Sequence, residues 1–534
     1  MKKIFIASIY LVLGTTGLLL TSCRSTDTES NLVSGAPTAV NFNLTGTEFS
    51  GGTATAQASV EGKGVAFTEA SVQKQTVMVD PSTVIVAELS PVSGSIKSST
   101  QASVGKAALA AVPGNALGAG IQFRVIAYNQ ADGSFQAFQD YTVGQQAVPM
   151  MLNVGATYTM VVYSYGTMTL PAITSGEKTS INNAQVNYDD ANRDFMYYNQ
   201  SNYIPVKGSN ILNITLRHKI AQITTIISSN GMANIASVTN AVLTPHYSNG
   251  TIPLSSGVMT GRSTLTTGVP LQFSNTTSTT SVAAPVFINA DTGGNKTGSF
   301  SADISLGSTI VTRNLANTFK ITPGYKSNLT INIEKCGAMV NGVWSVFMCH
   351  NLEADTTADP FTPAAAIHGA KYQWGAQTGE AGRYVSQADD QSRSGIILGW
   401  NTTAKPNGSW SDSSKTSNDP CPTGYRIPTL AQWQAVIANN NIERVGSWAN
   451  TDINYTTALY FINPSNVRTL MLPAAGFRNF PSGVLGSRGL AGFYWSSSET
   501  SSSSSANFFA FNSSSVNMRI GPRTYGFPVR CIAE

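Results

Sequence analysis

Cysteine is the residue type whose number and spacing in this chain point most clearly to chemistry. Of five cysteines in 534 residues, four fall in the C-terminal stretch: Cys336, Cys349, Cys421 and Cys531. Thiols pair and stay paired in an oxidising compartment outside the cytoplasm. The pattern predicts a disulfide-stabilised module over residues 336–534, and four cysteines allow three different pairings.

The other reactive side chains form no recognisable catalytic or metal-binding pattern. The four histidines are scattered at His218, His246, His350 and His368, and each is expected to be structural or exposed. No hydrolytic triad can be assembled from them. We therefore expect neither enzymatic activity nor a cofactor.

One segment begins like a calcium loop, with oxygen ligands at alternate positions from Asp190 to Asp194. However, Phe195 stands where the sharp turn requires glycine, and Ser201 stands where a bidentate glutamate belongs. We expect a solvated turn here and no metal site.

The N-terminus carries an export signal. A basic start at Lys2 and Lys3 precedes an apolar run over residues 4–20, which ends in Leu20-Thr-Ser-Cys23. This tetrapeptide resembles the lipobox of bacterial lipoproteins, which implies removal of a signal peptide, residues 1–22, and diacylation of Cys23. The alternative is an ordinary secretory signal with a chance cysteine. No other stretch is long and apolar enough to span a bilayer.

Composition excludes some partners. Only 11% of residues are charged, the net charge is +4, and no basic run could neutralise phosphates, so we expect no nucleic-acid partner. The length suggests three or four domains, and 42% hydrophobic residues suffice to give each a core. Residues 23–37 lack periodicity and are expected to form a flexible tether.

From residue 38 to about 335 the pattern is almost wholly β. Residues 40–44 and 121–128 alternate apolar and polar side chains, and the turn-forming residues 129–133 follow the second of these strands. Such alternation is typical of half-buried antiparallel strands. We predict a mainly β protein with two antiparallel β-sandwiches, residues 38–184 and 185–335.

Several short tracts in this region carry a resemblance. They are a Phe-Arg-Val-Ile-Ala-Tyr strand (123–128), an Asp-Gly turn (132–133), a Tyr-Thr-Met-Val-Val-Tyr-Ser strand (158–164), Asp-Phe-Met-Tyr (194–197) and residues 216–223. Together they resemble the fimbrillin family of pilin-like lipoproteins. The resemblance implies two transthyretin-like sandwiches, removal of the first strand by a protease, and insertion of a neighbouring subunit's strand into the vacated groove. Here the removable strand would be Val40–Leu44.

The processing site that this resemblance implies would follow a basic residue. No arginine occurs between Arg24 and Arg124, and Arg124 lies inside a predicted strand. The candidate processing sites are therefore Lys63 and Lys74.

The C-terminal module has its own local signals. Thr429 and Gln432 fit a capping box for a helix that carries Trp433, Val436 and Ile437 inward. Short apolar runs between long loops predict an α+β module.

Three tracts in the module, Gly-Tyr-Arg-Ile-Pro-Thr (424–429), Tyr-Trp-Ser-Ser-Ser-Glu (494–499) and Gly-Phe-Pro-Val-Arg-Cys (526–531), resemble the FISUMP-type domain, which is similar to C-type-lectin-like and formylglycine-generating-enzyme-like folds. The resemblance implies that Cys421 pairs with Cys531, which leaves Cys336 to pair with Cys349. The tripeptide of calcium-dependent lectins is absent, and structural disulfides leave no reactive cysteine pair of the enzyme type.

We expect a fimbrial tip or accessory adhesin, because the last predicted strand of the second sandwich runs straight into the module and is not free to be donated. Aromatic faces can stack on sugars or apolar groups. The candidate ligand-binding residues are Trp374, Trp400, Trp410, Tyr494, Trp495 and Glu499. Core packing is the alternative for each tryptophan and is favoured for Trp495.

The expected partners are other fimbrial subunits, a host or bacterial surface protein or glycan, and the outer membrane through the lipid before processing. The alternative function is an acylated surface lipoprotein that binds glycan directly without pilus assembly. Both place the chain at the outer membrane surface or in a fimbrium.

Overall fold

The computed structural model describes residues 35–50, 72–92, 112–114, 116–230, 233–274, 277–306, 309–464 and 466–534. The signal peptide, Cys23 and Lys63 lie outside these ranges. The described part is mainly β. Its helices are the 3-10 helix Ala365–Ile367, α1 (Gln387–Ser392) and α2 (Leu430–Asn439). None of these is long and apolar enough to cross a bilayer.

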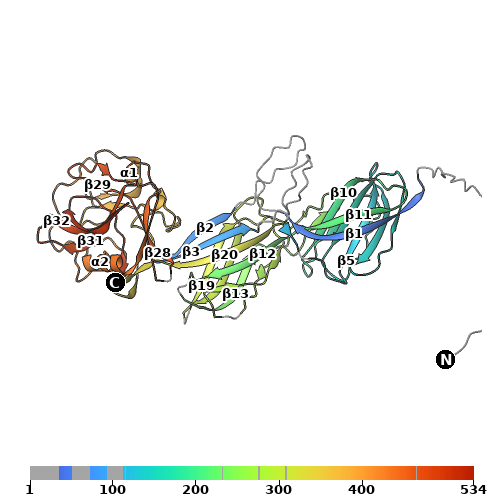
Figure 1. The fold of residues 1–534 in the computed structure, drawn as a ribbon, viewed down its shortest axis with the longest axis horizontal. Coiled ribbons are helices and arrows are strands. Elements are labelled where there is room, and N and C mark those ends of the chain that lie inside the picture. Colours follow the sequence, from blue (N-terminus) through green and yellow to red (C-terminus); the bar gives the residue numbers. More distant parts are fainter. Residues whose placement is uncertain are drawn as a thin grey trace, which may run out of the picture.

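The chain forms three bodies in a row (Figure 1). We call them the N-terminal β-unit, the central β-unit and the C-terminal module. The first is built on an eight-stranded sheet with the order β4-β1-β11-β10-β8-β5-β6, in which β7 also pairs with β1. Its strands are β1 (Pro37–Phe49), β4 (Val112–Pro113), β5 (Gln122–Asn129), β6 (Phe135–Thr142), β7 (Met150–Asn153), β8 (Tyr158–Ser164), β10 (Met196–Tyr203) and β11 (Asn210–His218).

Two neighbouring strands of this sheet, β5 and β8, are buried along nearly their whole length. Val125 and Val162 face one core, and Ile126 and Val161 face another on the opposite side of the sheet. Burial on both faces explains why β8 is almost wholly apolar, and why the alternation expected over residues 121–128 gives way to consecutive apolar residues from Val125 to Tyr128.

The central β-unit has two sheets that share one core. One has the order β16-β12-β20-β3-β2 with β17 also on β12, and the other has the order β15-β13-β18-β19. Their strands are β2 (Gln73–Asp80), β3 (Thr83–Pro91), β12 (Ala221–Ser228), β13 (Ile235–Thr244), β15 (Val269–Pro270), β16 (Thr280–Val282), β17 (Val286–Ile288), β18 (Gly298–Leu306), β19 (Thr309–Phe319) and β20 (Lys326–Lys335). Ile223 and Leu329 from the first sheet join Phe300 and Leu315 from the second in this core. A further pair, β9 (Gln185–Asn187) with β14 (Thr251–Pro253), packs beside the N-terminal β-unit.

Strand pairing divides the chain differently from the boundary expected near residue 185. β10 and β11 lie beyond that boundary but belong to the N-terminal sheet, where they pair with β8 and β1. β2 and β3 lie before it but belong to the central β-unit, because β3 pairs with β20 in antiparallel register. Alternation identifies each strand but not a partner so distant in sequence.

The C-terminal module consists of short strands and long loops around α2. Its strands are β21 (Gly337–Val340), β22 (Val343–Val346), β23 (Lys371–Tyr372), β24 (Tyr384–Val385), β25 (Tyr425–Arg426), β26 (Asn441–Val445), β27 (Ala458–Ile462), β28 (Arg468–Pro473), β29 (Phe477–Arg478), β30 (Leu485–Gly486), β31 (Ala491–Glu499), β32 (Ser505–Asn512), β33 (Val516–Pro522) and β34 (Ile532–Ala533). The predicted capping box is confirmed: Gln432 N donates to Thr429 Oγ1 at 3.1 Å, and Thr429 N donates to Gln432 Oε1 at 2.8 Å.

The module is attached to the turn between β2 and β3. The backbone N–H groups of Cys336 and Cys349 donate to the carbonyl oxygens of Ser82 and Pro81, both at 2.8 Å. The same cysteines pack with Val84 and Val86 of β3 in a small buried cluster. Since β20 leads directly into Cys336, the module is held both through the chain and through the neighbouring hairpin.

Candidate functional site

The first candidate site is the edge of β1 that faces away from β11. Residues 37–40 on this edge pair with β7, and residues 48–49 pair with β4. Between these contacts, residues 41–46 have no ladder partner on this side among the described strands. Within the described residues, the sheet therefore has a gap in the middle of β1, and such an edge can pair with another strand.

A groove runs beside this gap. Its cavity measures about 290 Å3, and its apolar lining consists of Phe42, Leu44, Ala116, Leu117, Phe123, Tyr141, Val143 and Ala147. Phe42 packs edge-on against Tyr141, with ring centroids 5.3 Å apart. The other lining residues are threonine, glycine and glutamine, so no charged side chain faces the groove. Free backbone groups beside apolar pockets are what an added strand requires.

The end of β1 reaches the central β-unit. The ring of Phe49 stacks on His218 and lies 6.5 Å from the ring of Phe287 on β17. Ser50 N donates to the carbonyl oxygen of Gly324 at 2.9 Å, and a further cavity of about 220 Å3 opens between the two units. The imidazole of His218 is held by Asp194 at 2.5 Å. β1 is thus a structural link between the units as well as a strand of one sheet.

The carboxylates of the calcium-like segment are occupied by neighbouring cations and imidazoles. Asp190 accepts from Arg193 at 2.9 Å and lies 2.6 Å from His246, and Asp194 holds His218. Within the described ranges, no cluster of three or more His, Cys, Asp or Glu side chains could hold a metal ion.

Of the two candidate processing sites, Lys63 lies outside the described residues and Lys74 lies in a strand. Lys74 stands opposite Glu88 in the β2–β3 ladder, and its Nζ atom lies 2.6 Å from Asp359 Oδ2 of the module. The side chain of Lys74 is 47% exposed, but cleavage after it would require part of the ladder to open.

The aromatic side chains expected to bind ligand are instead in the core. Trp374, Trp410, Tyr494 and Trp495 have no exposed surface, and Trp400 is 6% exposed. Backbone carbonyl groups accept each indole N–H; they belong to Ser496 for Trp374, Thr524 for Trp400, Asn418 for Trp410 and Tyr372 for Trp495.

The remaining polar groups of this set are also occupied. The hydroxyl of Tyr494 donates to Pro473 O at 2.9 Å, and burial raises the pKa of this phenol. The carboxylate of Glu499 accepts from the backbone N–H of Gly408. Because large aromatic rings bury the most apolar area, a loop-rich module without long helices uses them as core. Core packing, the alternative interpretation, holds for all these tryptophans.

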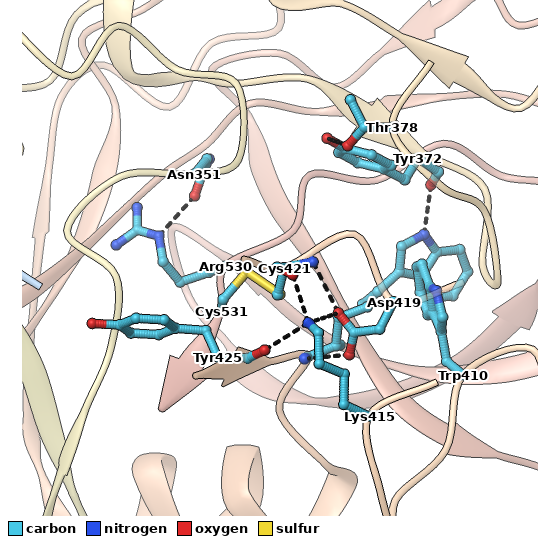
Figure 2. The surroundings of a disulfide bond; sticks show 12 residues. Asn351, Tyr372, Thr378, Trp410, Lys415, Asp419, Cys421, Tyr425, Arg530 and Cys531 are labelled. Atoms are coloured by element: carbon cyan, nitrogen blue, oxygen red, sulfur yellow. Dashed lines mark hydrogen bonds and ion pairs between the residues drawn. A yellow bond between two sulfur atoms is a disulfide. The ribbon is translucent and has the colours of Figure 1, made fainter. Parts of the chain in front are cut away.

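The structure has two disulfides, Cys421–Cys531 and Cys336–Cys349, which are the pairs that the resemblance implies. Figure 2 shows the first of these with its surroundings. The Nζ atom of Lys415 donates to the carbonyl oxygens of Cys421 and Tyr425. This lysine ties the loop before Cys421 to β25.

A buried ion cluster, which no pattern in the sequence indicates, lies deeper in the module. The carboxylate of Asp390 accepts from Lys371 at 2.5 Å, from Arg478 at 2.6 Å and from Arg488 at 2.6 Å. All four side chains are at most 2% exposed. Burial alone would raise the pKa of Asp390, but the three cations outweigh it and lower the pKa to about 2.

Burial also acts on the neighbours of this carboxylate. It lowers the pKa of Lys371 to about 8 against the opposing effect of Asp390, and it lowers the pKa of His368 to about 3. The four charged residues come from a helix, two strands and a loop that are distant in the sequence, so neither spacing nor local pattern could have revealed that they meet. The cluster is a scaffold for the loops that it joins.

Comparison with known proteins gives a domain-level match and distant structural likenesses. A family model described as a domain of unknown function (DUF8237) matches residues 457–532, which span β27 to β34. No curated protein matches the chain.

Among solved structures, the fimbrial anchor protein Mfa2 from Porphyromonas gingivalis is similar with a TM-score of 0.27 and 11% identity, over 43% of this chain and 92% of that one. The tip fimbrial protein Mfa3 from the same organism, truncated at its C-terminus, is similar with a TM-score of 0.27 and 9% identity, over 40% of this chain and 93% of that one. At these values the likenesses do not assign a function.

Proposed function

We propose that this chain is a tip or accessory subunit of a fimbrium, assembled by strand exchange at its N-terminal β-unit and adhesive through its C-terminal module. The observation that carries the proposal is the contrast between two strands. β1 has an open edge beside an apolar groove, whereas β20 is paired on both sides.

The N-terminal β-unit would act as the acceptor. Withdrawal of β1 would expose the edge of β11, which pairs with β1 from residue 210 to residue 217. An incoming strand would replace those backbone hydrogen bonds and place alternate side chains in the groove that Phe42 and Leu44 now line. Backbone pairing would supply affinity, and the pockets would fix the register.

The central β-unit would have no strand to donate. β20 runs parallel to β12 on one side and antiparallel to β3 on the other, and it continues into Cys336, which is disulfide-bonded. Pulling it out would break two ladders and detach the module. A subunit that receives a strand but gives none suits the end of a filament.

The proposal includes several finer points. The two β-units would be transthyretin-like sandwiches, the module would be C-type-lectin-like, and Cys23 would carry the lipid that holds the precursor at the outer membrane. Processing would occur after Lys63, because cleavage there would free β1 and leave the β2–β3 hairpin in the central β-unit. Partners would be other fimbrial subunits and a host or bacterial surface molecule.

A second function, an acylated surface lipoprotein that keeps β1, is favoured by one observation. Phe49 at the end of β1 and the next residue, Ser50, contact the central β-unit, so removal of this segment would cost contacts in both units. Such a protein would bind a glycan directly, without entering a filament.

Immunogold labelling of sheared filaments with antibodies against the module distinguishes these functions. Label at filament ends is the result expected for a tip subunit, and label at intervals along the shaft is expected for an accessory subunit. Label that stays on the cell envelope and never on filaments would support the lipoprotein.

A further inference from the structure

The C-terminal module exposes an apolar surface that its buried tryptophans do not provide. Six of the nine exposed large apolar side chains in the described part of the module lie on three loops, residues 393–400, 449–456 and 479–490. We call these six side chains the loop patch: Ile396, Leu398, Ile453, Phe480, Val484 and Leu490. Leu398 is 93% exposed and Ile453 is 82% exposed, so they have almost no contacts within the fold.

The first and third loops are bound directly to each other. Ile397 N donates to Ser482 O at 2.9 Å, and Leu485 N donates to Ser394 O at 2.8 Å. Beneath them, the guanidinium group of Arg478 donates to Arg393 O at 2.7 Å and to Gly483 O at 3.2 Å. One buried arginine therefore fixes both loops.

The second loop is tied in through the neighbouring arginine. Arg488 donates to Asp452 O at 2.6 Å, and Thr451 N donates back to Arg488 O at 3.2 Å. Both arginines bind the carboxylate of Asp390, which lies on α1. Figure 1 draws α1 and β29, the strand that carries Arg478, on the same side of the module.

The buried ion cluster thus holds three loops in fixed positions while their apolar side chains point outward. A rigid apolar patch with no internal role is the usual mark of an interaction surface, since preorganised side chains lose little entropy on binding. Two of the side chains protrude almost completely, which suits insertion into pockets of a partner.

The charge pattern around the patch limits the kind of partner. Arg393 is paired with Asp389 at 3.1 Å, and exposed Asp452 leaves the three loops with no excess of positive charge. Adsorption to an anionic membrane surface relies on unpaired basic residues, which these loops lack. Glycan stacking requires exposed aromatic faces, and Phe480 is the sole aromatic member of the patch.

We propose that the loop patch is the surface through which the module binds an uncharged, apolar area on a partner protein. The inference rests on the proposed adhesive role and names the partner class for it. The neutral, aliphatic character of the patch matches such an area and matches neither a sugar nor an anionic bilayer.

The test uses the purified full-length protein and binding to cultured epithelial cells and to bacterial cells. A double substitution, Leu398→Ser with Ile453→Ser, removes the two most exposed members of the patch. The matched control is Ile520→Ser, which removes a 66% exposed isoleucine on β33, outside the patch. Unchanged thermal unfolding of both variants shows that the fold is intact.

We expect the double variant to bind cells at least tenfold more weakly than the wild type, and the control variant to bind equally well. Proteinase treatment of the cells should abolish wild-type binding, whereas periodate oxidation of their glycans should not. Vesicles of phosphatidylcholine and phosphatidylglycerol should not bind the protein.

Equal binding by the double variant and the wild type would show that the loop patch is not the binding surface, while the adhesive role of the module would still hold. Binding lost on periodate treatment would identify a glycan, and vesicle binding would identify a lipid; either result would overturn the protein partner. A wild-type chain that binds no cells would overturn the adhesive role together with this inference.

Discussion

The ring of Phe49 stacks on the imidazole of His218, with centroids 3.9 Å apart and planes inclined by 5°. Phe49 ends β1, His218 ends β11, and the next aromatic neighbour, Phe287, belongs to the central β-unit. The stack therefore lies where the two β-units meet. Since Phe49 is only 2% exposed, its burial stabilises the junction as well as the position of β1.

Replacement of Phe49 by alanine should lower the stability of the protein by about 3 kcal/mol, as for other buried aromatic residues. Chemical denaturation followed by circular dichroism measures this change. Phe480→Ala is the control, because Phe480 is 45% exposed and touches neither β-unit. Equal effects of the two substitutions would mean that the junction does not depend on the stack.

Glu334 on β20 gives a pH dependence with a definite sign. Burial raises the pKa of the Glu334 carboxyl from its ordinary value of 4.5 to about 7; the charge of Asp359 adds to the increase and Lys74 opposes it. Between pH 4.5 and pH 7 the Glu334 carboxyl is therefore mostly protonated in the folded protein and mostly ionised in the unfolded protein. The free energy of unfolding should therefore fall as pH rises from 5 to 8.

Glu334→Gln removes this titration and should make the protein more stable than the wild type at pH 8, by about 2 to 3 kcal/mol. The difference should shrink towards pH 5. Unfolding of both proteins at several pH values measures it, with the exposed Glu353→Gln as control. A difference that does not vary with pH would contradict an unusual protonation of Glu334.

Asp390 should be the most sensitive charged residue of the module. Asp390→Asn leaves Lys371, Arg478 and Arg488 without their shared carboxylate, and loss of one partner from a buried ion pair costs about 3 to 5 kcal/mol. Its neighbour Asp389 is 55% exposed and pairs with Arg393, so Asp389→Asn should change stability little. Similar unfolding midpoints for the two variants would show that the cluster is not a scaffold.

The two disulfides should contribute unequally. Cys421 and Cys531 are separated by 110 residues, against 13 for Cys336 and Cys349. In the chain-entropy model the longer loop contributes roughly 5 kcal/mol and the shorter one about 3 kcal/mol. Paired Cys→Ser substitutions compared by thermal unfolding test this order, and a larger loss from the short loop would contradict it.

Local features of the fold followed from the sequence, because each depends on neighbouring residues. The capping box predicted the start of α2, and alternation predicted β1 and β5. Pairing was not predictable: β3 lies beside β20, and strand alternation carries no information about such distant partners.

The candidate binding residues show a second limit. A tryptophan between turn residues has the same local sequence whether its side chain is exposed or buried. Here Trp374 and Trp410 are buried, and backbone carbonyl groups accept their indole N–H groups. The exposure of Leu398 and Ile453 could not be predicted either, because single apolar residues in loops are common. These residues form one surface because Arg478 and Arg488 hold their loops together, and those contacts are visible only in the structure.

The most direct test of strand-exchange assembly is mass spectrometry of the N-terminus, from purified filaments and separately from the membrane fraction. We expect a start at Gly64 in filaments, blocked by Lys63→Gln but not by Lys74→Gln, and an acylated Cys23 in the membrane fraction. An acylated Cys23 in every fraction would rule out strand exchange, because β1 would then never leave its place in the sheet.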